Sequence, residues 1–302
     1  MKIINFIEKN FWLPMIAASI AGLLLPTSYT VINNLVIPLV MIMFLLTCLK
    51  INFLDVIGHY KNISIIIYIL LIYLLIIPIG IYFLYGFINP ELAIGMLLLT
   101  AIPPGAASPM LTDIFKGNIS LSMAIVLIAY FVSPFSIIFL FSLLTQKTIQ
   151  LNLINLIQTL LLINYLPLII SEIIKKINKS FIEKTKKYYS FINIMCICFI
   201  IYIALATQSK IIFQHPLDTV INTLWLYLLF ITIYIISYFI VFWKKKSDKV
   251  AVAITKTYMN NGLALGLAIT FFSPKIILLM ILSEITWNTT LGPFKYFTKY
   301  LK

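Results

Sequence analysis

The chain is a succession of apolar runs, and this feature limits its fold more than any other. With 62% hydrophobic and 10% charged residues among 302 positions, it has too little polar surface for a soluble domain. A helix needs about 20 mainly apolar residues to cross the hydrocarbon of a bilayer. Runs of that order follow one another along almost the whole chain. The sequence therefore predicts an all-α, polytopic membrane protein embedded in a lipid bilayer.

Ten membrane-spanning helices are predicted from these runs. Their approximate ranges are 11–25, 31–49, 63–87, 92–115, 119–144, 151–174, 189–207, 219–243, 250–273 and 276–297. The three cysteines and two histidines of the chain support neither a disulfide framework nor a metal cluster, so no metal site is expected.

Lysine placement supports this span count, because short cytoplasmic loops collect Lys and Arg. With the N-terminus inside, eighteen lysines fall on the cytoplasmic side and three, Lys147, Lys210 and Lys275, on the other. We therefore expect a protein of the cell membrane with both termini in the cytoplasm. The net charge of +13 then reflects basic loops against an anionic leaflet, and no nucleic-acid partner is expected.

Two of the apolar runs are interrupted by residues that break or polarise a helix. The fourth carries Pro103, Pro104, Gly105, Ala106, Ala107, Ser108 and Pro109, and the ninth carries Thr255, Lys256, Thr257, Tyr258, Met259, Asn260, Asn261 and Gly262. Proline removes a backbone donor, and broken helices persist in a membrane only where they are buried or line a wet cavity. Paired interruptions in two halves indicate the binding site of a secondary transporter.

The interruptions lie in the fourth span of each half when ten spans are divided by five. Because five is odd, the second half enters the bilayer from the opposite side. We therefore predict two inverted five-helix repeats, residues 1–148 and 149–302, within one membrane domain.

The interrupted segments resemble the bile acid:sodium symporter family. The family's motif Pro-Gly-Gly-x-x-Ser-Asn-x-x-Thr, with a following Gly-Asn/Asp turn and Leu-Ser, is matched by Pro104, Gly105, Ser108, Thr112, Gly117, Asn118, Leu121 and Ser122. A second motif, Glu-x-x-x-Gln-Asn-Ser-Gly-Leu-Ala, is similar to residues 255–264, and weaker similarity covers about 38–268. The resemblance implies a panel and a core, with broken helices 4 and 9 crossing at the binding site.

Sodium-coupled members of this family bind two sodium ions through oxygens near the crossover, and the chain departs from that pattern. Ser108 and Ser122 keep an oxygen. The replaced positions are Pro109 for Asn, Val126 for Thr, Thr255 for Glu, Met259 for Gln, and Tyr73, five residues before Pro78, for Gln. Sodium is a hard cation that needs several oxygen ligands. We therefore expect no sodium coupling and no cofactor.

Two charged residues inside spans are the candidates for coupling, together with Thr255 and Ser122. Lys256 stands beside the position of the missing Glu, where its ammonium could replace a bound cation, attract a substrate carboxylate or carry a proton. Alternatively, its long side chain could snorkel toward the lysines at 244–249. Glu284 could pair with Lys256, titrate by itself, or remain protonated and bonded to a Thr or Ser.

The substrate-binding candidates are Pro104, Gly105, Ser108, Thr112, Asn260, Asn261 and Gly262. Amides in an apolar span are costly unless they bond a partner. Half-helices that start after Pro109 and near Gly262 would direct positive dipole ends to the crossover, which suits an anionic group. The leading hypothesis is a secondary active or facilitative transporter of a small organic anion that works by alternating access without sodium, with Lys256 replacing a cation.

Three alternatives stay open at this stage. One is a sodium-coupled, bile-acid-type organic anion symporter. Another is a membrane receptor or sensor that binds without transport. The third is an intramembrane enzyme, against which the chain shows no His-Glu-x-x-His, paired-Asp or Gly-x-Ser-x-Gly motif.

Overall fold

The computed structural model describes residues 4, 6–7, 10, 12–25, 34–50, 63–145, 152–214, 216–298 and 300, and these are helical with short connections. No strand occurs among them, which confirms the all-α prediction. Within this part of the chain, six helices are long and apolar enough to cross a membrane: Ile63–Gly86, Ile119–Leu144, Ile154–Ile177, Lys179–Thr207, Pro216–Phe239 and Pro274–Thr298. Four shorter apolar helices, of 10–17 residues, accompany them.

The finer topology stays a prediction. The lysines Lys2, Lys9, Lys61, Lys147, Lys299 and Lys302, on which the predicted sidedness partly depends, lie outside the described residues. The predicted boundary between repeats at 148/149 also falls outside them. The count of ten spans and the inverted repeat therefore rest on the sequence pattern.

The chain divides into two compact units, each built from segments far apart in sequence. The first contains α2 (Trp12–Leu24), α4 (Val36–Lys50), most of α11 (Leu153–Ile177), α12 (Lys179–Thr185), η2 (Lys186–Tyr188) and α13 (Tyr189–Gln214), with residues 265–281. Within it, α2 lies along α13. A Cβ added at Gly22 would lie 2.8 Å from Leu205 Cβ and from the carbonyl oxygen of Tyr202, so only glycine permits this close approach.

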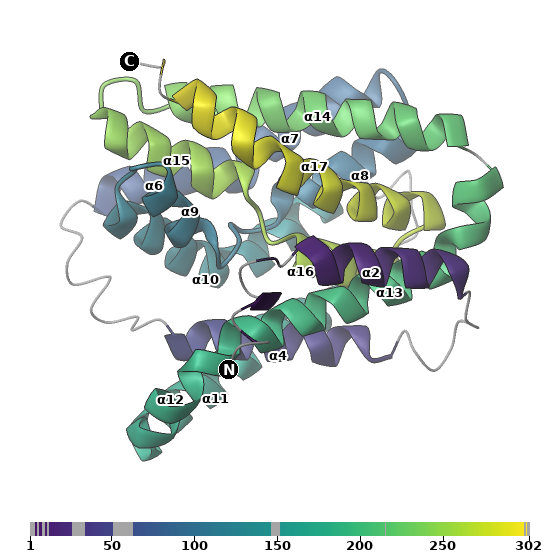
Figure 1. Cartoon of the computed structure of the whole chain (residues 1–302). Helices are drawn as coiled ribbons and strands as arrows, with labels where there is room; N and C mark the ends of the chain where they lie inside the picture. The colour runs from purple at the N-terminus through teal and green to yellow at the C-terminus, as the bar shows by residue number, and fades with distance from the viewer. Residues whose placement is uncertain are drawn as a thin grey trace. The chain divides into compact units, whose positions relative to one another are not determined.

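The second unit carries both interrupted segments (Figure 1). It contains α6 (Ile63–Leu71), η1 (Ile72–Ile76), α7 (Ile77–Gly86), α8 (Pro90–Ala101), α9 (Ser108–Ile114), α10 (Ile119–Leu144), α14 (Pro216–Phe239) and α15 (Lys246–Thr257), with residues 258–264 and 282–302. Asparagine begins two of these helices. The side chain of Asn89 accepts from the amides of Glu91 and Leu92, and that of Asn118 from the amide of Leu121.

Both predicted interruptions are present. The fourth apolar run is divided into α8 and α9 by residues 102–107, and the ninth into α15 and α16 (Asn261–Phe271) by residues 258–260. A third irregularity was not predicted: the run at 63–86 contains the π-helical turn η1 just before Pro78. Such turns mark functional sites in many helices. The last helix, α17 (Pro274–Thr298), is continuous.

Candidate functional site

The two interruptions pair with each other through their backbones. Gly105 donates its N–H to the carbonyl of Tyr258 at 2.9 Å, and Asn260 donates to the carbonyl of Pro103 at 2.9 Å. Pro104 and Met259 thereby form a short antiparallel bridge. Backbone groups that leave a helix inside a membrane must find protein partners, and here each interruption supplies them for the other.

Gly105 is required by the closeness of this pairing. A Cβ at this position would lie 3.0 Å from the carbonyl oxygens of both Tyr258 and Met259. Those oxygens belong to backbone, which cannot rotate away as a flexible side chain could. Glycine at this position of the motif therefore serves a close backbone approach.

Three predicted hydroxyl side chains form one buried hydrogen-bonded group. Ser108 Oγ donates to the carbonyl of Tyr258 at 3.0 Å, which ties α9 to the opposite interruption. Thr112 Oγ1 lies 2.8 Å from the carbonyl oxygen of Ser108 and 3.0 Å from Ser122 Oγ, within hydrogen-bond distance of both. All three side chains are fully buried. The structure thus brings Ser108, Thr112 and Ser122 together within the second unit.

Lys256 is buried between two backbone carbonyls. Its side chain is 2% exposed, and Nζ donates to the carbonyl of Tyr73 at 2.7 Å and to that of Thr100 at 2.5 Å. The side chain therefore does not snorkel toward the lysines at 244–249. No ion pair joins Lys256 to Glu284, both of which are described, so the suggested pairing between them is absent.

Prolines explain why these two carbonyls are available. In η1 the N–H of Ile77 bonds to the carbonyl of Ile72, five residues earlier. In the same register the carbonyl of Tyr73 would require the N–H of residue 78, which is proline. The carbonyl of Thr100 also lacks a backbone N–H donor, because residues 103 and 104, three and four positions later, are both proline. The ammonium thus supplies donors that the backbone lacks at both places.

Two of the substituted positions, Tyr73 and Thr255, lie at this same place. The hydroxyl of Tyr73 donates to the carbonyl of Val252, and its oxygen lies 3.3 Å from Thr255 Oγ1. Tyr73 stands where the family resemblance expects Gln, and Thr255 where it expects Glu. The Tyr73 ring also lies 5.5 Å from Lys256 Nζ. Sequence reasoning identified Tyr73 only as a departure and missed Thr100, although the proline spacing after each residue was a usable signal.

The asparagines at the start of α16 have different environments. Asn260 Oδ1 accepts from the amide of Leu263 at 3.2 Å, so this side chain caps the helix. Asn261 is 5% exposed, and neither polar atom of its side chain has a hydrogen-bond partner among the described residues. A buried amide without partners is costly in a protein interior. Gly262 follows it in the first turn of α16 and is buried.

Glu284 lies in α17, partly buried and apart from Lys256. Its backbone carbonyl accepts from Asn288 Nδ2 at 2.8 Å, whereas its carboxylate makes no hydrogen bond or ion pair with the described residues. The alternative of a carboxyl bonded to a neighbouring Thr or Ser is therefore not observed in this part of the chain. Glu284 remains a candidate for proton binding by position alone.

Sequence comparison identifies the family of the chain. The model of the SBF-like CPA transporter family (DUF4137) matches residues 10–287, which is most of the chain. The chain belongs to this family. The resemblance to bile acid:sodium symporters is thereby confirmed at the family level. A search among curated proteins gives no match.

Membership defines the class of activity. As an SBF-like CPA transporter the protein is a multi-pass membrane transporter, not an enzyme, in agreement with its apolar helices. The paired interruptions, the hydroxyl group around Thr112 and the buried Lys256 are therefore features of a transporter's interior.

Proposed function

We propose that this protein is a secondary transporter of a small organic anion, works by alternating access without sodium, and uses Lys256 as a fixed cation. The observation that carries the proposal is the placement of the Lys256 ammonium against the carbonyls of Tyr73 and Thr100. Two carbonyl oxygens without backbone donors attract a cation, and an ammonium on the chain supplies one permanently.

The loss of sodium ligands and the gain of the lysine support each other. A charged lysine in mid-membrane costs about 2.5–3.5 kcal/mol on insertion scales, so it persists where its charge is used or compensated. Lys256 is compensated by dipoles, since both hydrogen-bond partners are neutral carbonyls. The site therefore keeps a net positive charge, which favours an anionic substrate over a cationic one.

Polar groups near the paired interruptions suit a carboxylate or sulfonate. An ammonium has three donors, of which Lys256 uses two on carbonyls. The side-chain amide of Asn261 is buried without a partner among the described residues. The half-helix α16 begins at Asn261, so its amides add partial positive charge. We assign anion recognition to these groups, with Ser108, Thr112, Pro104 and Gly105 maintaining the backbone pairing.

Proton coupling and facilitated transport remain the two modes under this proposal. Glu284 is the carboxylate in the second unit best placed to carry a proton, because it lies within the span of α17 without an ionic partner among the described residues. Uptake into proteoliposomes under an imposed pH gradient distinguishes proton coupling from facilitated transport. If transport is coupled to protons, Glu284→Gln should abolish the response of uptake to the pH gradient. If transport is facilitated, the variant should leave the flux unchanged.

The decisive experiment measures thermal unfolding of the purified protein in detergent. A panel of mono- and dicarboxylates and sulfonates is tested in sodium chloride and in choline chloride, with Lys256→Met beside wild type. We expect at least one anion to raise the unfolding temperature equally in both salts, and Lys256→Met to lose this response. The matched control is Lys245→Met, which removes an exposed lysine at the start of α15 and should retain the response.

The same experiment tests the main alternative. A sodium-coupled symporter requires that the anion stabilise the protein in sodium chloride and not in choline chloride. That result would overturn sodium independence. Anion binding that survives in Lys256→Met would overturn the role of the lysine.

A further inference from the structure

A second cationic site lies at one end of the second unit, apart from Lys256. A pocket of about 410 Å³ is lined by Ile114, Phe115, Lys116, Lys246, Ser247, Val250, Lys295 and Thr298. The three lysines come from three different places: the turn after α9, the first residue of α15 and the last part of α17. None of these lining residues is acidic.

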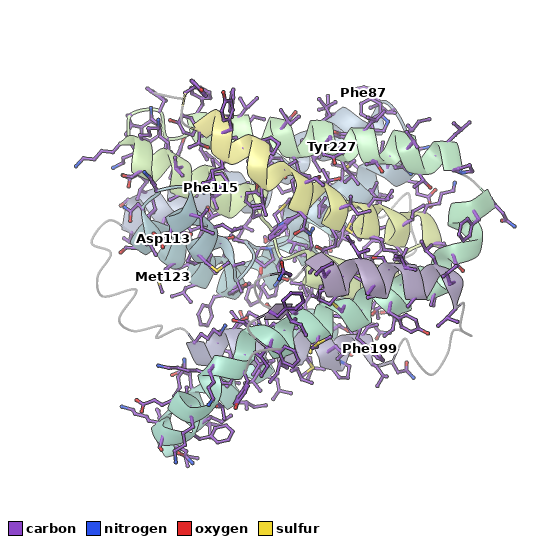
Figure 2. The ribbon with its side chains drawn as sticks, viewed as in Figure 1. Phe87, Asp113, Phe115, Met123, Phe199 and Tyr227 are labelled. Carbon is purple, nitrogen blue, oxygen red and sulfur yellow. The ribbon has the colours of Figure 1, made fainter. Side chains whose placement is uncertain are left out.

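Packing fixes two of the three places that carry the lysines, the turn after α9 and the start of α15. The helices α9, α10 and α15 pack together, as Figure 1 shows. Asn118 donates its N–H to the carbonyl of Ser247 at 2.8 Å, and its side chain donates to Asp248 Oδ1 at 2.8 Å. The carboxylate of Asp248 is thus engaged by Asn118, and it does not line the pocket. Phe115, labelled in Figure 2, forms an apolar part of the lining and contacts the ring of Tyr258.

Lys116 occupies a backbone position that ordinarily takes glycine. Gly117 donates to the carbonyl of Thr112 and Lys116 to that of Asp113, which is the helix-ending motif with a left-handed residue after the cap. Lys116 has φ of 59°, a conformation that is uncommon for residues other than glycine. A lysine in this position costs conformational energy, which is consistent with a use for its side chain in the pocket.

The start of α15 adds to the positive potential. The helix begins at Lys246 without a side-chain cap, so the partial positive charge of its first turn lies beside the pocket residues Lys246 and Ser247. The hydroxyl group of Ser247 supplies a further donor, whereas the Thr298 hydroxyl already donates to the carbonyl of Phe294 at 2.6 Å. Three ammonium groups, one hydroxyl and a helix start match the oxygens of a phosphate group better than a single carboxylate.

We infer that this pocket binds a phosphate-bearing anion on the predicted cytoplasmic side. The ligand chemistry is a phosphate held by Lys116, Lys246 and Lys295, with the apolar lining beside it. Such a group comes either from the headgroup of an anionic phospholipid or from a soluble phosphate compound. Basic pockets between helices at the cytoplasmic face are suited to anionic headgroups. The inference is independent of the proposed transport function.

The test uses the full-length protein purified in detergent without organic anion. Unfolding temperature and native mass spectrometry are measured with phosphatidylglycerol or phosphatidylcholine in mixed micelles and, separately, with inorganic phosphate or glycerol 3-phosphate at matched ionic strength. The pocket variant carries Lys116→Gln, Lys246→Gln and Lys295→Gln. The control variant carries Lys184→Gln, Lys186→Gln and Lys187→Gln, which removes the same charge from exposed positions outside the pocket.

We expect phosphatidylglycerol, and not phosphatidylcholine, to stabilise wild type and the control variant, and the pocket variant to bind it at least tenfold more weakly. A response to the soluble phosphates alone would support the phosphate site and show that its ligand is a soluble compound, not a lipid headgroup. No response to any phosphate compound would overturn the inference, as would equal losses in both variants, because these would report only total charge.

A single substitution separates ligand binding from folding. Lys116→Gly suits the left-handed backbone, so the unliganded protein should unfold at the same or a higher temperature. The response to phosphatidylglycerol should nevertheless weaken severalfold. A full response in Lys116→Gly would show that Lys116 does not take part in binding. Lys256→Met should keep the response to phosphatidylglycerol. A failure of the transport proposal, which depends on Lys256, can therefore be distinguished from a failure of this inference.

Discussion

Lys256 Nζ donates a hydrogen bond of 2.7 Å to the backbone carbonyl of Tyr73, a residue 183 positions earlier in the chain. The same ammonium bonds the carbonyl of Thr100 at 2.5 Å, so one side chain joins the π-helical turn, the end of α8 and α15. Each carbonyl has lost its backbone donor to a proline. A charge inside the second unit is therefore held by neutral dipoles and not by a carboxylate.

Removal of the ammonium should destabilise the protein. Lys256→Met keeps the length and apolar part of the side chain but leaves two buried carbonyls without a donor, at about 1–3 kcal/mol each. Relief of the buried charge offsets part of this cost, so we expect a net loss of about 1–3 kcal/mol and a lower unfolding temperature in detergent. Lys245→Met, at an exposed position, should change neither the free energy of unfolding nor the unfolding temperature. An unfolding temperature unchanged in Lys256→Met would contradict a structural role for the two bonds.

A double-mutant cycle tests whether the ammonium replaces a missing backbone donor. Pro78→Ala restores an N–H five residues after Tyr73, where the π-helical register can use it. In the Lys256→Met background this substitution should recover part of the lost stability, with a coupling energy of about 0.5–3 kcal/mol. Pro134→Ala restores an N–H within α10, which takes no part in these bonds, and should be additive with Lys256→Met. If Pro78→Ala and Pro134→Ala showed equal coupling energies with Lys256→Met, the ammonium would not be the replacement for a missing backbone donor.

The sodium ligands suggested by the family resemblance can be rebuilt at the same place. The variant Tyr73→Gln, Thr255→Glu and Lys256→Ala places an amide oxygen and a carboxylate beside the carbonyls of Tyr73 and Thr100. These are ligands that a hard cation prefers. We expect sodium chloride to raise its unfolding temperature relative to choline chloride, an effect absent from wild type.

Thr255→Glu alone is the control for this gain. The ammonium of Lys256 stays in place in that variant, and the new carboxylate should pair with it rather than with sodium. Its unfolding temperature should therefore be the same in both salts. Sodium dependence in this single variant would show that the ammonium does not occupy the cation position.

The pairing of the two interruptions depends on Gly105. Gly105→Ala places a Cβ 3.0 Å from the carbonyl oxygens of Tyr258 and Met259, so the two backbones must separate. Overpacking of this kind costs about 1–3 kcal/mol. Gly80→Ala in α7 is the matched control, since no atom lies within 4 Å of its added Cβ. We expect a lower unfolding temperature for Gly105→Ala only. Tolerance of alanine at both positions would show that the interruptions are less tightly paired.

Much of the fold follows from the sequence because the bilayer restricts the choices. Apolar runs of membrane length predict helices, and prolines 103 and 104 predict an interruption, since no neighbouring residue can replace their missing donors. The π-helical turn at 72–76 was not predicted, because Pro78 is compatible with several local adjustments of a helix. Which adjustment forms depends on what bonds the freed carbonyl.

The sequence also identified most candidate side chains but not their partners. Lys256 was recognised as a charge within an apolar run that could replace a cation, attract a substrate carboxylate, carry a proton, pair with Glu284 or snorkel. The structure places it on the carbonyls of Tyr73 and Thr100. The proline spacing marks both carbonyls as short of a backbone donor, but it does not indicate which side chain supplies one, so neither bond could be identified from the sequence.

The sequence by itself determined that this chain is a helical membrane protein with two interrupted helices, because hydrophobic length and proline chemistry are local properties. Only the tertiary structure decided that the interruptions pair at Pro104 and Met259, that Lys256 is buried between two carbonyls, and that Lys116, Lys246 and Lys295 line one pocket. Each of these relationships includes residues that are more than a hundred positions apart. They depend on which donor reaches which acceptor in three dimensions, and a linear pattern does not encode that distance.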